Sequence, residues 1–71
     1  MLFSGIHLNV VLATSIFVLN SSHVLIIEDE AVTRTALTVL LEYQGAIVLA
    51  VGSIQEGIQA IESGFQPDLL V

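Results

Sequence analysis

From residue 22 onward, the spacing of apolar positions changes from one stretch of the chain to the next. His23–Ile27 is a continuous apolar run that follows a polar turn and ends at three acids. Such a run is typical of a strand buried on both faces, as the strands of parallel sheets are. In residues 31–44 apolar side chains recur every three or four positions, which predicts a helix with one apolar face. We expect that face to consist of Val32, Ala36, Leu37, Leu40, Leu41 and Tyr43.

A second strand is predicted directly after this helix. Gly45 stands where a helix commonly ends in a left-handed residue, and residues 46–51 are apolar and rich in β-branched side chains. Ser53 and Glu56 then have the spacing of a capping box. In that motif the Ser53 hydroxyl accepts from the Glu56 amide, and the Glu56 carboxylate reaches back to the Ser53 amide.

A second helix and a third strand complete the pattern. The helix carries Ile54, Ile58 and Ile61 on one predicted apolar face, and Gly64 is its expected end. Pro67 prevents the helix from resuming, and residues 68–71 predict the beginning of a strand. The order strand, helix, strand, helix, strand with short connections indicates an α/β fold with a parallel sheet.

The first nineteen residues form an apolar leader of a different kind, which we separate from the α/β part as residues 1–21 against 22–71. Thirteen of residues 1–19 are apolar and none is charged. The leader is short for a membrane-spanning helix, and no Lys or Arg flanks it to set an orientation. Two alternatives stay open: an apolar segment with strand character that belongs to a larger protein or to misassigned upstream sequence, and a membrane-associated helix.

The charge balance excludes several classes of function. The chain has 71 residues, seven acids, one basic residue (Arg34) and a formal net charge of −6. A nucleic-acid binder needs several cations to neutralise phosphates, so we expect no nucleic-acid partner. The absence of cysteine excludes disulfides and thiolate chemistry. No spacing of serine, histidine and acid argues for a nucleophilic triad, and we do not expect an enzyme.

The candidate chemistry lies in the triplet Glu28-Asp29-Glu30, where the first strand ends and the first helix begins. Ligands of open α/β sheets bind outside the carboxyl ends of the strands, and adjacent carboxylates suit a hard cation such as Mg²⁺. The alternative is helix capping, with Asp29 as the N-cap and Glu30 as an acid of the first turn. Glu30 also precedes Arg34 by four residues, which predicts a weak surface ion pair.

Three segments together resemble the receiver domain of response regulators in two-component signalling. Residues 23–30 are similar to its first strand and acidic turn, residues 45–53 to its second strand, and residues 65–71 to the beginning of its third strand. The likeness covers two βα units and the start of a third. It implies a partial doubly wound, flavodoxin-like sheet.

The resemblance also implies a site and partners. Glu28 and Asp29 match the acidic pair that holds Mg²⁺ beside the phosphorylated aspartate, although aspartate is more frequent at the first position. The phospho-accepting aspartate itself would lie two positions beyond Val71, so Asp68 is not the acceptor. The implied function is that of a truncated receiver domain in a cytoplasmic phosphorelay, whose intact relatives receive phosphate from a histidine kinase or phosphotransfer protein. A small membrane-anchored interaction protein with an acidic cytoplasmic part is the alternative.

Overall fold

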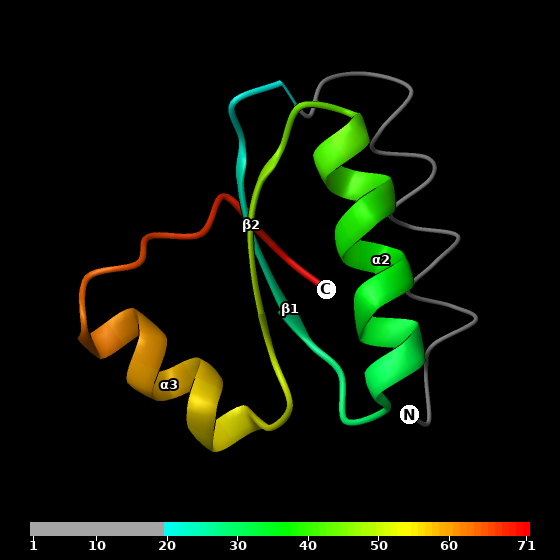
Figure 1. The fold of residues 1–71 in the computed structure, drawn as a ribbon. Coiled ribbons are helices and arrows are strands. Elements are labelled where there is room, and N and C mark those ends of the chain that lie inside the picture. Colours follow the sequence, from blue (N-terminus) through cyan, green and yellow to red (C-terminus); the bar gives the residue numbers. More distant parts are fainter. Residues whose placement is uncertain (1–19) are drawn as a thin grey trace.

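The computed structural model describes residues 20–71, which form a three-stranded parallel sheet with two helices (Figure 1). The elements are β1 (His23–Ile27), α2 (Ala31–Tyr43), β2 (Ile47–Val51), α3 (Ile54–Glu62) and β3 (Leu69–Leu70). The predicted α/β class is therefore confirmed, and each predicted element is present. The strand and membrane alternatives for the leader concern residues outside the described part of the chain. Neither described helix has the length and apolar character that crossing a bilayer requires.

The strand order is β2-β1-β3, which places the first strand in the centre. In the pairing of β1 with β2, His23 lies opposite Ile47 and Ile27 opposite Val51. In the pairing of β1 with β3, Val24 lies opposite Leu69 and Leu25 opposite Leu70. The chain steps from β1 to one side and then back across it to reach β3. Right-handed crossovers in opposite directions place the two connecting helices on opposite faces of the sheet, as Figure 1 shows for α2 and α3.

The main core lies between the sheet and α2. Leu37 and Leu41 of α2 are buried together with Val24 and Ile26 of β1. The predicted apolar face of α2 included residues that do not contact the sheet: Val32 and Tyr43 are 74% and 87% exposed. Only the side of the helix that carries Leu37 and Leu41 faces the sheet.

The isoleucines of the predicted apolar face of α3 are not the residues that meet the sheet. Ile54, Ile58 and Ile61 are all exposed, and Gly57 is the buried residue of this helix. A side-chain carbon added at Gly57 would lie 2.8 Å from Ile27 Cδ1 and 3.7 Å from Leu25 Cδ2. The helix therefore approaches β1 through its glycine, which leaves the isoleucines to the side.

The predicted helix ends agree with the structure. Gly45 follows α2 with φ +92°, and a side chain there would lie 2.7 Å from Asn20 Oδ1, so the position favours glycine on two grounds. Gly64 follows α3 with φ +113°. Ser53 caps α3 by accepting from the Glu56 amide at 3.2 Å. The Ser53 hydroxyl also donates to Glu56 Oε1 at 3.1 Å, in place of the predicted bond from the Ser53 amide.

Replacing Ser53 with alanine should destabilise the fold by about 1 kcal/mol, because the Glu56 amide would lose its acceptor at the start of α3. Urea denaturation followed by circular dichroism measures the change. Ser63→Ala at the other end of α3 is the matched control and should have a smaller effect. Equal denaturation midpoints for S53A and the unsubstituted chain would contradict the capping role.

Candidate functional site

The predicted acidic residues lie at the carboxyl end of the central strand. β1 ends at Ile27, and Glu28, Asp29 and Glu30 form the turn into α2. α2 connects β1 to β2 on one side of it, and α3 connects β2 to β3 on the other side of β1. Because the connections diverge here, this end of β1 is the switch point at which open α/β sheets bind ligands.

Glu28 is part of the packed structure, since only 1% of its surface is exposed. Its amide donates to the carbonyl of Val51 at 3.0 Å, which continues the pairing with β2. Its Oε2 accepts from the amide of Glu30 at 3.0 Å. A buried carboxyl group is costly to hold without such bonds, so these contacts fix the direction of the side chain.

Asp29 is exposed beside it. A hydrogen bond with the Glu28 side chain lowers the pKa of Asp29 below its usual value. Asp29 therefore carries a negative charge at neutral pH, and the side chain beside it is that of the buried Glu28. The structure thus brings the two predicted ligand residues together.

The N-cap of α2 is Glu30, so the prediction that Asp29 caps this helix is wrong. The Glu30 carboxylate accepts from the amides of Val32 at 3.1 Å and Thr33 at 2.8 Å, and from the Thr33 hydroxyl. These bonds lower the pKa of Glu30, the Thr33 side-chain bond most strongly. Glu30 therefore satisfies the first amides of α2, and Asp29 does not cap this helix.

Arg34 acts at the site in a way that its spacing did not predict. Its Nη1 donates to the carbonyl oxygen of Glu28 at 2.8 Å, in place of the expected ion pair with Glu30. The guanidinium also passes Gly52 at the end of β2, where an added side-chain carbon would lie 3.2 Å from Nη1. The only cation of the chain thus holds the turn that carries the two acids. The one signal in the sequence was that Arg34 is the sole basic residue.

Acid should weaken the fold through this turn. Asp29 and Glu30 have lowered pKa values when folded, so they stabilise the structure at neutral pH, above the values of the unfolded chain. That contribution is lost as the pH falls below about 4 and these groups are protonated. We expect the urea midpoint to drop between pH 6 and pH 3, and to drop less in Glu30→Gln. Glu42→Gln at the far end of α2 is the control; an equal loss in both variants would contradict the role of Glu30.

The magnesium ion that the resemblance implies would find two carboxyl groups at this end of β1. Asp29 and Glu28 offer carboxylate oxygens, the ligands that Mg²⁺ prefers, and one or two carboxylates with water and phosphate oxygens often complete its shell. Within residues 20–71 no group of three or more metal-ligating side chains lies together. The predicted pair alone would therefore supply only part of a coordination shell.

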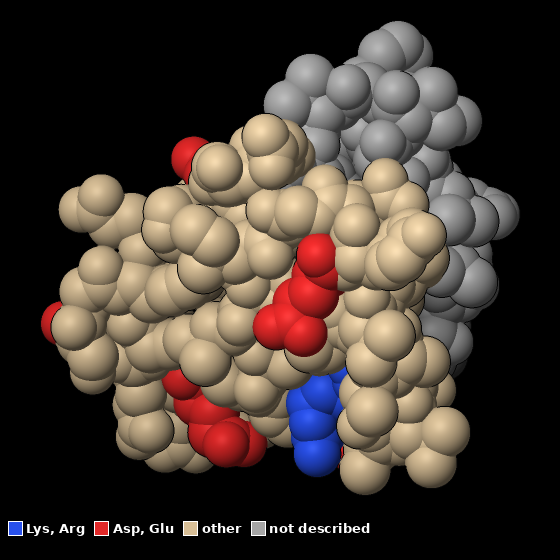
Figure 2. Space-filling view, turned by 45° about the horizontal axis from the view of Figure 1, so that its top comes forward, with Lys and Arg blue, Asp and Glu red and all other residues tan. Residues whose placement is uncertain are grey.

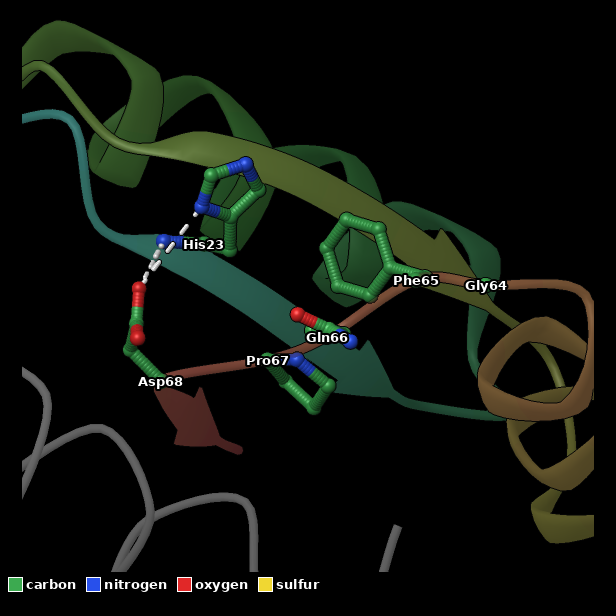
Figure 3. A pocket seen from close by; sticks show the side chains of 6 residues that line it. All are labelled: His23, Gly64, Phe65, Gln66, Pro67 and Asp68. Carbon is green, nitrogen blue, oxygen red and sulfur yellow. Dashed lines mark hydrogen bonds and ion pairs between the residues drawn. The ribbon is translucent and has the colours of Figure 1, made fainter.

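A second feature lies at the opposite end of β1, where His23 and residues 64–68 line an open hollow of about 410 Å³ (Figure 3). The backbone amide of His23 donates to Asp68 Oδ2 at 2.8 Å. The same oxygen lies 3.7 Å from Nδ1 of the His23 ring. The His23 ring meets Phe65 edge to face, 5.8 Å between centroids. Asp68 was predicted to be a turn or solvent-facing acid; it is more than half exposed but also fastens the start of β3 to β1.

Charged side chains are few on the surface. Figure 2 shows acidic groups dispersed over a largely uncharged face, with Lys or Arg exposed at one place only.

Comparisons of the chain with protein-family models, with curated proteins and with solved structures found no match in any of the three. The likeness to receiver domains therefore stays a prediction that depends on the residues of the chain itself.

Proposed function

We propose that residues 22–71 are the N-terminal part of a response-regulator receiver domain with a flavodoxin-like sheet. The observation that carries the proposal is the position of Glu28 and Asp29, in contact with each other at the carboxyl end of the central strand. The order β2-β1-β3 supports it, because flavodoxin-like sheets begin in this order. In the intact family such a domain receives a phosphoryl group from a histidine kinase or phosphotransfer protein.

Within this function the two acids have different tasks. Asp29, exposed and anionic, is the residue that we assign to direct contact with Mg²⁺. Glu28 is buried and bonded to the Glu30 amide, so its task is to orient Asp29, or to reach the ion through water. When bound, the ion would neutralise negative charge that gathers around a transferred phosphoryl group.

Arg34 supports the same site from the helix. By holding the Glu28 carbonyl it fixes the backbone between the strand and the acids. Glu30 fixes the other side of the turn through its bonds to the start of α2. The two carboxyl groups are therefore held by contacts on both flanks, which is the preorganisation that a ligand site requires.

Sequencing the transcript past the Val71 codon tests the proposal directly. β3 runs beside β1 with Val24 opposite Leu69, so the residue two positions after Val71 would lie level with Glu28, beside the acidic pair. We expect an aspartate there, in the same or a shifted reading frame. An unrelated continuation without that aspartate would contradict the assignment to the receiver family.

A further inference from the structure

Two side chains of opposite charge lie against Gly52, the residue that follows β2. A side-chain carbon added at Gly52 would lie 3.2 Å from Arg34 Nη1 and 3.3 Å from Glu56 Oε1. Arg34 belongs to the beginning of α2 and Glu56 to the beginning of α3, so the two helices on opposite faces of the sheet reach the end of β2 through these side chains.

The glycine at position 52 is explained by space and not by backbone conformation. Among the glycines of residues 20–71, only Gly45 and Gly64 have positive φ, so no left-handed conformation requires glycine at 52. A methyl group there would press on the guanidinium of Arg34 from a distance shorter than ordinary contact. Because Nη1 donates to the Glu28 carbonyl at 2.8 Å, displacing the guanidinium would strain that bond.

Glu56 approaches the same point from the side of α3. Its Oε1 accepts from the Ser53 hydroxyl at 3.1 Å, which holds the carboxylate at the start of the helix. Arg34 Nη1 and Glu56 Oε1 are therefore well within the roughly 8–10 Å over which opposite charges attract at ordinary ionic strength. Glu56 is exposed, so this attraction guides the guanidinium and adds little to stability.

We propose that Arg34 is a positioning residue of the acidic pair, that Gly52 gives its guanidinium the room to reach the Glu28 carbonyl, and that Glu56 keeps it there. The three side-chain positions join the beginning of α3 to the turn that carries Glu28 and Asp29. In its effect on magnesium the inference rests on the proposed function. The residues involved lie at the ends of β1 and β2, so none of them depends on the neighbours of β3.

Nuclear magnetic resonance of the metal-free chain tests the connection between α3 and the acidic turn. Glu56→Gln should shift the side-chain Nε–H signal of Arg34 and the amide signals of Asp29 and Glu30. Glu62→Gln makes the same change at the other end of α3 and is the matched control, which should leave these signals in place. Unshifted signals in E56Q would overturn the connection.

A titration with Mn²⁺ tests the positioning role. Arg34→Lys and Gly52→Ala both keep the net charge, so a change in affinity reports geometry and not the electrostatic field at the site. Lysine lacks the planar fork of arginine, and we expect R34K to weaken Mn²⁺ binding about tenfold, as the loss of a group that orients metal ligands commonly does. Gly52→Ala should weaken it about threefold, because the bond to Glu28 is strained and not lost. In the double variant G52A should add little to R34K, since the group that it displaces is already absent.

The outcomes separate this inference from the proposed function. Unchanged Mn²⁺ affinity in R34K would overturn the positioning role, and full additivity of the two substitutions would overturn the role of Gly52. Absence of Mn²⁺ binding by the unsubstituted chain would instead contradict the proposed magnesium site, and the metal-free signals would then decide the connection through Arg34. Circular dichroism verifies that each variant is folded.

Discussion

Replacing Leu41 with alanine is expected to abolish the folded state at room temperature. Leu41 is fully buried between α2 and the sheet, in the cluster that also holds Leu37, Val24 and Ile26. Truncating such a leucine costs about 2–5 kcal/mol. A core of this size rarely supplies more than about 3–5 kcal/mol in total, because a short chain buries a small fraction of its surface.

The measurement is far-ultraviolet circular dichroism with a urea titration of both chains. We expect L41A to show little helical signal even without urea. Val39→Ala lies on the exposed side of the same helix and should shift the stability by no more than about 0.5 kcal/mol. If L41A denatured at the same urea concentration as the unsubstituted chain, the core described above would be wrong.

Local signals in the sequence were sufficient for the elements and their ends. The continuous apolar run of β1, the left-handed glycines after α2 and α3, and the capping serine of α3 each act through neighbouring residues. Such signals need no knowledge of the rest of the fold, which is why Gly45, Gly64 and Ser53 were placed correctly.

The side of each helix that faces the sheet could not be predicted in the same way. α2 is apolar on more than one side, so spacing alone did not separate buried Leu41 from exposed Val32. In α3 the buried position is Gly57, a residue without a side chain that no hydrophobic pattern detects. Both choices depend on where a strand lies in space, which is a tertiary property.

The acidic turn was predicted at its place between β1 and α2, but its contacts were not predicted. The resemblance identified Glu28 and Asp29, and the structure brings them together. The helix cap was assigned one residue too early, because three consecutive acids can each serve as a cap and only the geometry of the turn selects Glu30. The contact of Arg34 with the Glu28 carbonyl, and that of His23 with Asp68, join residues whose proximity depends on the completed fold.

Magnesium binding at the acidic pair is expected to be weak and to depend on Asp29. Two carboxyl groups supply only part of the coordination shell, and Mg²⁺ gives up its water reluctantly, so we expect a dissociation constant on the order of a millimolar or weaker. The substitution Asp29→Asn removes the exposed charge with little change in shape. It should weaken binding about tenfold or more. Glu28→Gln should also weaken it, since residues that orient a metal ligand commonly affect affinity by about 10–100-fold.

Paramagnetic broadening of backbone amide signals by Mn²⁺, competed with Mg²⁺, measures this binding at the site itself. Broadening should centre on residues 28–30 and on the start of α2, and D29N should remove it. Asp68→Asn makes the same chemical change at the opposite end of the sheet, where the carboxylate bonds to His23, and should leave the broadening unchanged. Broadening that persists in D29N would exclude Asp29 as the ligand, because the ion would then be held by other acids. Micromolar affinity would contradict the partial shell, since two carboxyl groups alone do not bind Mg²⁺ so tightly.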